Sequence, residues 1–241
     1  MKKSKTNPKK RVLVFSVLAG LLIVGGVLFC LFGLPYIRRH YQTVHVNRAE
    51  AARMDPVDMG NRNGLIVYFT RVGNTDFEPD VDAVSSASLM EDNGTLIGNA
   101  QLLSEMIANA TGFDTYAIKV KDLYSSSYDD TVSEANEENK SGTIRELDGE
   151  LPDLEAYDSI FLVYPLWWWT LPQPVKTFLT ETDLTGKTLY SVVTHGGSKF
   201  GHAAEDTAEL TAATISSNAL EVYDDDVTKA APKVTAWLKG L

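Results

Sequence analysis

The chain has 241 residues, of which 44% are hydrophobic and 22% are charged, and its formal net charge is −10. This composition is ordinary for a globular protein, and the length is sufficient for one domain with additional segments. Its single cysteine, Cys30, excludes a disulfide within the chain and, with only four histidines, a structural zinc site.

The N-terminal residues predict a membrane anchor. Residues 1–11 form a basic tail, and residues 12–34 carry no charged side chain. A helix over the apolar stretch is about 34 Å long, enough to cross a hydrocarbon core of about 30 Å. We place the transmembrane helix at residues 12–37, with residues 12–34 in the lipid bilayer. A cleaved signal peptide is the alternative, although its apolar region is normally shorter, at roughly 7 to 15 residues.

The flanking charges predict an orientation and a connection. Positive charges are more numerous before the apolar segment than directly after it. By the positive-inside rule, this favours an N-terminus in the cytoplasm and a domain outside it. Residues 38–63 are polar without clear periodicity, which predicts a linker or a short juxtamembrane helix. We expect the folded domain over residues 64–241.

That domain is strongly acidic, because residues 64–241 contain 11 Lys and Arg against 29 Asp and Glu, a net charge of −18. Such a surface repels the phosphates of nucleic acid, so a nucleic-acid partner is excluded. It favours a basic protein partner instead.

Apolar runs predict five buried strands in this domain, and amphipathic segments predict helices between them. The strands are expected at residues 64–70, 115–120, 158–164, 188–194 and 219–223. The helices are expected at residues 99–112, in part of 128–145, and at 175–180, 202–213 and 225–240. This alternation predicts an α/β fold with a doubly wound parallel sheet, covered by helices on both faces. Such sheets bind ligands beyond the carboxyl ends of their strands.

Three of the segments that follow these strands have distinctive compositions. TRVGNTD (70–76) offers hydroxyls and backbone N–H groups suited to a phosphate, although an ordinary turn has a similar composition. WWW (167–169) lies among three prolines and provides either a flat apolar wall or packing for the core or a membrane interface. THGGSKFG (194–201) combines glycines with His195. Together the three loops suit a ligand with a phosphate tail and a flat ring.

These residues carry a resemblance to a known family. TRVGNT (70–75) resembles the flavodoxin phosphate loop [ST]-x-T-G-N-T, with Val72 where a hydroxyl usually stands. YDSIFLVYPLWWWTLPQPVKTFL (157–179) is similar to the YP-x-WW and P-x-x-x-x-TFL signature of one flavodoxin-like branch. DLTGKTLYSVVTHGGSKFG (183–201) resembles the TH-x-G-S block of that branch. The resemblance covers residues 64–241 and implies a five-stranded sheet of order 2-1-3-4-5 with bound FMN.

The resemblance also implies which residues contact the cofactor. In the family, the first loop wraps the ribityl phosphate, the second contacts the isoalloxazine ring, and the third closes the other side of the ring. Arg71 is expected to act mostly through its backbone. The matching positions are Thr70, Arg71, Val72, Gly73, Asn74, Thr75, Pro165, Leu166, Trp167, Trp168, Thr194, His195, Gly196 and Gly197.

Two features depart from an ordinary flavodoxin. Residues 75–97 separate the first loop from the next amphipathic helix, which follows a second Gly-Asn pair. Because a helix N-terminus favours phosphate, we expect a split site in which Asn99 and Ala100 join the first loop. Val72 removes a hydroxyl, which weakens phosphate binding by about 1 kcal/mol where no other donor replaces it.

The resulting functional hypothesis is a membrane-anchored FMN protein that carries electrons between redox partners. The acidic domain and the aromatic wall predict a low potential for the second electron. His195 is a candidate catalytic residue that protonates a substrate or contacts the ring, or else a loop residue without such a role. Two alternatives remain open, an FMN-dependent NAD(P)H:quinone reductase and a non-redox binding module that has kept only the fold.

Overall fold

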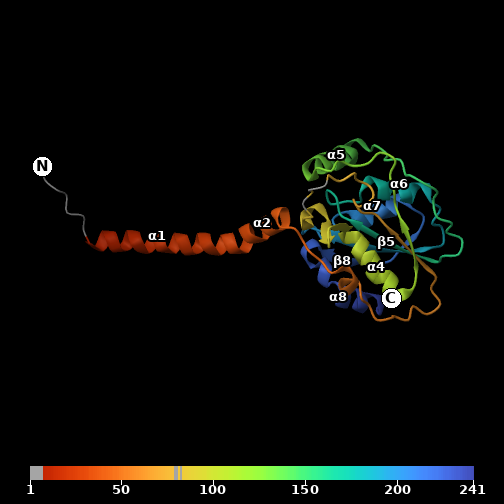
Figure 1. Ribbon diagram of the computed structural model, residues 1–241, viewed down its shortest axis with the longest axis horizontal. Helices are drawn as coiled ribbons and strands as arrows, with labels where there is room; N and C mark the ends of the chain where they lie inside the picture. The colour runs from red at the N-terminus through yellow and green to blue at the C-terminus, as the bar shows by residue number, and fades with distance from the viewer. Residues whose placement is uncertain (1–7, 79–80, 82) are drawn as a thin grey trace. The chain divides into compact units, whose positions relative to one another are not determined.

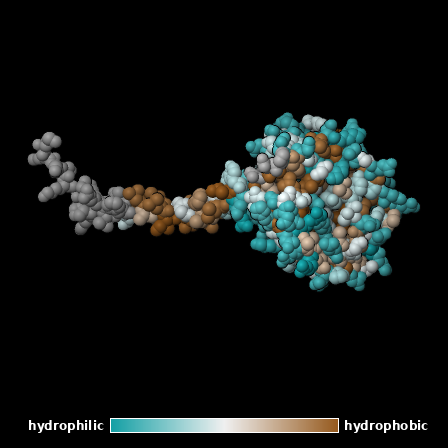
Figure 2. Space-filling view, viewed as in Figure 1, coloured by the Kyte–Doolittle hydropathy of each residue, from teal (hydrophilic) through white to brown (hydrophobic). Residues whose placement is uncertain are grey.

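The N-terminal unit is a single long helix. The computed structural model describes residues 8–78, 81 and 83–241, and the chain divides into two units, Met1–Gln42 and Thr43–Leu241. In the first unit, α1 (Pro8–Leu28), a π-helical turn (Phe29–Gly33) and α2 (Leu34–Tyr41) follow one another. The stretch Ser16–Tyr41 is long and apolar enough to cross a membrane by length and composition. Its apolar side chains are exposed on the helix surface (Figure 2).

The second unit is an α/β domain, and its first element is a short helix. Its helices are α3 (Arg48–Ala51), α4 (Asn99–Thr111), α5 (Tyr128–Ser141), α6 (Gln173–Glu181), α7 (Ala203–Leu210) and α8 (Ala231–Leu238), with 3-10 helices η2 (Ser85–Ala87) and η3 (Asp224–Lys229). Its strands are β1 (Gly64–Tyr68), β2 (Leu89–Asp92), β3 (Thr95–Gly98), β4 (Asp114–Ala117), β5 (Ser159–Pro165), β6 (Thr188–His195), β7 (Thr214–Ile215) and β8 (Leu220–Tyr223).

The central sheet has the predicted flavodoxin-like arrangement. Its strands run β4-β1-β5-β6, and β6 pairs with both β7 and β8, all in parallel. In chain order, the five expected strands therefore occupy the expected order 2-1-3-4-5. The sheet differs from the expectation at one edge, where the two-residue strand β7 pairs with the start of β6 and β8 pairs with its end.

Side chains of alternate strand residues pack into two separate hydrophobic cores, one on each face of the sheet. Phe161 and Val163 of β5 pack on the side of α4 and α8, and these helices lie side by side (Figure 1). Ile160 and Leu162 face the opposite side, where α6 and α7 contribute. Every residue of β5 is buried, as expected for a central parallel strand covered on both faces. Both layers of the predicted doubly wound fold are thus present.

The segment 75–97 contains structure that the sequence reading did not assign. β2 and β3 form an antiparallel hairpin that turns at Asn93 and Gly94, both with positive φ. An Asp-Asn-Gly sequence between two apolar runs is a hairpin signal. The hairpin and η2 form a small apolar cluster of their own, which includes Val84 and Leu89.

The segment before β1 packs onto the domain. Within the range expected to be a linker, Ala52, Val57 and Met59 are buried in the core on the side of α4, and Val57 N–H donates to Ala110 O at 2.8 Å. Arg48 forms an ion pair with Glu105 of α4. The folded unit accordingly begins at Thr43 rather than at Gly64.

The expected C-terminal helix is divided. η3 covers Asp224–Lys229, and α8 starts at Ala231 with Pro232 in its first turn, a position where proline is favoured because its missing N–H is not required. Four apolar side chains of this segment are buried in the core: Val227, Val234, Trp237 and Leu238.

Candidate functional site

Three loops meet at the carboxyl edge of the sheet. They follow β1, β5 and β6, which are adjacent strands. Pro165 lies beside Thr194 in the β5–β6 register, and Leu166 N–H donates to Thr194 O at 2.8 Å. The chain leaves β1 for β4 on one side and continues with β5 on the other, which makes β1 a topological switch point, where open α/β sheets bind ligands.

The first loop, residues 70–75, contains buried donors without partners. The hydroxyls of Thr70 and Thr75 are buried and have no hydrogen-bond partner among the described residues. Buried polar groups are almost always hydrogen-bonded, so two orphaned hydroxyls in one loop indicate a ligand position. Both can donate to an anion.

The side chain of Asn74 is hydrogen-bonded within the protein. Its Nδ2 donates to Thr70 O at 2.8 Å and to Ile118 O at 2.9 Å, and its Oδ1 accepts from Val120 N–H at 2.9 Å. The amide therefore fixes the loop to the chain that continues from β4. This side chain shapes the loop, and both of its amide N–H groups are already engaged.

The start of α4 lies directly against the first loop. Gly98 precedes the helix, and a Cβ at this position would overlap the Thr70 hydroxyl. Asn99 is the first residue of α4, and its buried Nδ2 has no partner among the described residues. Ala100 is buried beside it. The structure thus brings together the two segments of the expected split site.

Val72 packs where a hydroxyl was expected. It contacts the cluster of Ala83, Val84, Ala87 and Leu89 contributed by the inserted segment. An apolar residue is favourable there because the hairpin covers this side of the loop. The inserted segment explains the departure from the usual loop sequence.

Arg71 is the largest side chain among the almost fully buried ones, with only 2% of its surface exposed. Its Nη2 donates to the carbonyls of Ser125 at 3.0 Å and Ser126 at 3.1 Å, and its guanidinium lies 5.2 Å from the ring centre of Phe77. Its Nε and Nη1 have no partner among the described residues. Burial lowers the pKa of Arg71 to about 10.

Lys119 is a second cation at the first loop, and the sequence reading missed it. Gly73 has φ of 79°, and a Cβ there would overlap Lys119 Nζ. Glycine is thus required both by the backbone conformation and by the lysine. Burial lowers the pKa of Lys119. Lys119 lies two residues beyond β4, the strand that pairs with β1.

Trp168 and Trp169 occupy the centre of a tight turn. Trp167 N–H donates to Thr170 O at 3.1 Å, and Thr170 N–H donates to Trp167 O at 3.0 Å. The φ angles of Trp168 and Trp169 are 51° and 64°. This left-handed conformation costs about 1–2 kcal/mol for each non-glycine residue, and Asn-Gly usually occupies such turns. Strain of this kind is typical of functional sites.

The three tryptophan side chains point to different surroundings. Trp167 contacts the rings of Phe69 and Tyr124 edge-on, with centroid distances of 5.4 and 5.1 Å. Trp168 Nε1 donates to Val132 O of α5 at 3.0 Å. Trp169 is 56% exposed. Only the first of the three packs against a core cluster.

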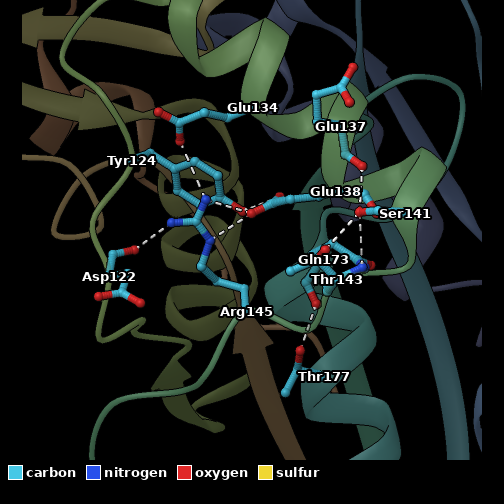
Figure 3. Close-up of polar contacts among 10 residues, drawn as sticks. All are labelled: Asp122, Tyr124, Glu134, Glu137, Glu138, Ser141, Thr143, Arg145, Gln173 and Thr177. Atoms are coloured by element: carbon cyan, nitrogen blue, oxygen red, sulfur yellow. Dashed lines mark hydrogen bonds and ion pairs between the residues drawn. The ribbon is translucent and has the colours of Figure 1, made fainter.

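Figure 3 shows a polar network around Tyr124, the residue whose ring contacts Trp167 edge-on. Tyr124 donates to Glu138 Oε2 at 2.9 Å, and Arg145 binds the other oxygen of Glu138 while its guanidinium stacks 4.0 Å from the Tyr124 ring centre. Burial of Tyr124 and the adjacent Glu138 raise the pKa of the phenol. Because every member is paired, the network holds Tyr124 firmly against Trp167.

The third loop is held by His195, and both ring nitrogens are engaged. Nδ1 accepts from Gly197 N–H at 2.9 Å, and Nε2 contacts Glu221 Oε2. Glu221 Oε1 accepts from Lys233 Nζ of α8 at 2.9 Å. Neither nitrogen is left for a substrate, so the geometry assigns His195 to positioning the loop. The sequence reading missed Glu221 and Lys233.

The remaining third-loop residues surround this histidine. Thr194 is buried, and its hydroxyl has no partner among the described residues. Gly197 has φ of 126°, which favours glycine. Gly196 lies between His195 and Gly197 and has interactions of its own. His202 N–H donates to Trp169 O at 2.7 Å and ties the segment after this loop to the tryptophan turn.

Comparison with known proteins assigns the family. A family model described as Flavodoxin matches residues 94–240. The chain belongs to the flavodoxin family. No curated protein matched the sequence.

Solved structures show the same fold. A putative flavoprotein from Bacteroides uniformis has a TM-score of 0.54 and 19% identity, covering 75% of this chain and 99% of its own. A putative flavoprotein from Bacteroides eggerthii has a TM-score of 0.49 and 22% identity, covering 73% and 99%. A Lactobacillus acidophilus flavoprotein in complex with FMN has a TM-score of 0.46 and 15% identity, covering 71% and 99%. Of these three, the first supports a shared fold.

Proposed function

We propose that this flavodoxin-family protein binds FMN at the carboxyl edge of its sheet and carries electrons between redox partners at a membrane. Family membership supports FMN as the cofactor. The observation that carries the proposal is a set of buried donors without partners among the described residues, in the first loop and at the adjoining start of α4: the Thr70 and Thr75 hydroxyls and the Asn99 amide. A phosphate supplies the acceptor oxygens that these donors lack.

The phosphate would lie between the first loop and the start of α4. Asn99 N–H donates to Ser88 O at 3.0 Å, and the next backbone N–H groups at the first turn of α4 have no partner within the helix and favour an anion. Thr70, Thr75 and Asn99 would donate from the side chains, while Arg71, Val72, Gly73, Asn74 and Ala100 would shape the site around them. Gly98 allows this approach because any side chain there would displace Thr70.

The ring would lie between the second and third loops. Pro165, Leu166, Trp167 and Trp168 would form one wall, and Thr194, His195, Gly196 and Gly197 would form the other. FMN supplies the electron-accepting and electron-donating chemistry when bound. The protein orients it, and the aromatic side chains exclude water from one side of the ring. His195 would keep the Gly197 N–H group at a fixed position through its bond to Nδ1.

The charge of the domain points to the kind of partner. Residues 64–241 have a net charge of −18, and this field would attract a basic redox protein and steer it toward the domain. The same field disfavours added negative charge at the site, so we expect a low potential for the second electron. No nucleic-acid partner is proposed.

The N-terminal helix would serve as a single-pass anchor. Ser16–Tyr41 is long and apolar enough to cross a membrane, and a signal sequence near an N-terminus can have the same length and composition. We propose that the helix is retained and that the domain faces away from the cytoplasm. Protease added outside intact cells that express the full chain should then release the domain. Protection of the domain in intact cells and its digestion after lysis would contradict this orientation.

An FMN titration of the purified full chain in detergent tests the function. Binding should saturate at one FMN per chain with quenched flavin emission, and reduction by NADH alone should be slow. Rapid NADH oxidation, with a quinone reduced in turn, would instead identify the NAD(P)H:quinone reductase. A folded protein that takes up no FMN would identify a non-redox module.

A further inference from the structure

The first residues of the domain form strand-like hydrogen bonds with the inserted segment. Val44 N–H donates to Ala83 O at 2.8 Å, and Glu91 N–H donates to Val44 O at 2.8 Å. Val46 N–H donates to Glu91 O at 2.9 Å. Residues 43–47 therefore lie along β2 as a third strand, and we call them the strap.

The hairpin that the strap joins is small. β2 and β3 have four residues each, and among the strands that the structure describes they pair only with each other. A two-stranded hairpin is at best marginally stable in water, whereas a third strand or packing against another element stabilises it. The strap supplies that third strand at the other edge of β2, with Glu91 as the residue that both donates and accepts.

The strap is itself attached to the core of the domain. Its two valine side chains pack against the hydrophobic core on the side of α4. Directly after the strap, Arg48 Nε donates to Glu105 Oε2 of α4 at 2.8 Å. Asn109 Nδ2, further along α4, donates to Ala52 O at 2.7 Å. The strap thus connects the inserted hairpin to the helix whose first turn adjoins the candidate site.

The hairpin in turn packs against the first loop of the candidate site. The two backbone bonds of Val44 lie on either side of residues 84–90. Apolar side chains of that range form the cluster that packs against Val72 of the first loop. β3 ends at Gly98, which lies directly against the Thr70 hydroxyl. A displacement of the hairpin would therefore uncover Val72 and move the chain that contacts Thr70.

We propose that the strap is a positioning segment for the cofactor site: it holds residues 83–98 against the first loop and thereby slows the dissociation of FMN. This proposal rests on the proposed function and adds to it a segment that lies outside residues 94–240, the part of the chain that the family model matches. The strap contributes no ligand to FMN. It acts through the hairpin, because its backbone bonds oppose the separation of the hairpin from the first loop.

The test uses the full chain in detergent and proline substitutions, which remove a single backbone N–H. Val46→Pro removes the bond to Glu91 O, and Val46→Ala keeps it. His45→Pro is the matched control, because the N–H of His45 makes no hydrogen bond to the hairpin among the described residues. The His45 side chain is 73% exposed and lies 3.8 Å from the Glu91 carboxylate, a contact that contributes little at an exposed position.

Hydrogen exchange of the FMN-free protein measures whether the strap holds the hairpin. Val46→Pro should accelerate amide exchange in β2, β3 and the first loop by about threefold to tenfold, the factor for one lost hydrogen bond. Exchange in the central strand β5 should not change. Val46→Ala should have a smaller effect, and His45→Pro should match the wild-type protein. Equal acceleration in β5 would overturn the proposal, because it would show that the strap stabilises the whole domain.

The rate of FMN dissociation measures whether the hairpin controls the site. Recovery of flavin emission after dilution of the FMN-loaded protein should be about threefold to tenfold faster in Val46→Pro. His45→Pro should release FMN at the wild-type rate.

The outcomes separate this proposal from the proposed function. If the wild-type protein bound FMN and Val46→Pro released it at the wild-type rate, the proposal would be overturned and FMN binding would stand. Equally fast release from Val46→Pro and His45→Pro would also overturn it, because the effect would not follow the hydrogen bond. If the folded wild-type protein took up no FMN, the proposed function would fail and this proposal with it.

Discussion

Arg71 and Arg145 belong to the same domain, and both side chains are largely buried. They differ in whether acidic residues surround the guanidinium. Arg145 binds Glu138 and Glu134 and stacks on Tyr124. Although burial alone would lower its pKa, Tyr124 and the two glutamates raise it. Arg71 is more deeply buried, has no acidic partner among the described residues, and has a lowered pKa. One guanidinium completes a structural network, and the other keeps two nitrogens without a hydrogen-bond partner among the described residues.

Removing each arginine in turn should give the largest contrast. Arg145→Leu leaves Glu138 buried without a cation, and only its hydrogen bond from Tyr124 remains. The free energy of unfolding should therefore fall by about 3–5 kcal/mol. Arg71→Leu removes an unpaired buried charge and should leave the stability of the FMN-free protein unchanged or raise it. Thermal unfolding followed by near-UV circular dichroism measures both. Equal destabilisation by the two substitutions would show that Arg71 is also structural.

A smaller effect should follow from a side chain at Gly98. Gly98→Ala pushes its Cβ into the Thr70 hydroxyl, which should destabilise the protein by about 1–3 kcal/mol and weaken FMN binding. In the double variant with Thr70→Ala, the overlap with the hydroxyl is removed, but the Cβ of residue 70 would still lie 2.7 Å from the new Cβ. Stability should therefore recover in part while FMN binding remains weak. Double-variant thermal unfolding and FMN titration separate the two effects. If the losses of stability in Gly98→Ala and Thr70→Ala simply added in the double variant, residues 98 and 70 would not be in contact.

The tryptophan turn should reveal stored strain of about 1 kcal/mol. Trp169→Gly relieves a left-handed backbone at a side chain that is mostly exposed, so stability should rise by about 1 kcal/mol. Trp169→Ala retains the strain and serves as the matched control, with no expected gain. Chemical unfolding midpoints measure the difference. Equal midpoints for the glycine and alanine variants would show that the turn is relaxed.

The smallest effect concerns pH and the third loop. Burial works against the charged carboxylate of Glu221, but its bonds with His195 and Lys233 outweigh burial and lower its pKa below 4.5. Ionised Glu221 therefore stabilises the fold above about pH 4.5, and this contribution is lost as the pH falls through its lowered pKa. Because Glu221 is partly exposed, the contribution should be about 1 kcal/mol or less. Glu221→Gln should reduce the difference in unfolding temperature between pH 6 and pH 3.5. If Glu221→Gln left the difference in unfolding temperature between the two pH values unchanged, the ionised Glu221 would not stabilise the fold.

The repeated pattern of apolar runs and amphipathic segments was enough to predict the sheet. All five strands of the expected order are present, because buried parallel strands need continuous apolar sequences such as Ser159–Pro165. The inserted hairpin was missed although its Asp-Asn-Gly turn is a local signal. The packing of residues 43–63 was missed because Val57 and Met59 are isolated apolar residues in a polar stretch, without a period to reveal them.

The parts of the candidate site that consist of consecutive residues could be predicted from the sequence. The contacts between residues far apart in the sequence could not. The loops at Thr70 and Thr194 were located because each directly follows an apolar strand. Pairs such as His195 with Glu221, or Gly73 with Lys119, join segments far apart in sequence. Their contacts depend on the register of the sheet and on side-chain direction, neither of which local patterns record.

The most direct measurement is calorimetric titration of FMN into the full-length protein in detergent, with phosphate-free buffer. The account predicts one FMN per chain, bound with quenched emission, and at least about tenfold weaker binding after Thr70→Ala and Thr75→Ala together, since each substitution removes a donor to a charged acceptor. Heat of binding that is absent in a folded protein, or unchanged after both substitutions, would contradict the claim that the orphaned donors of the first loop hold a flavin phosphate.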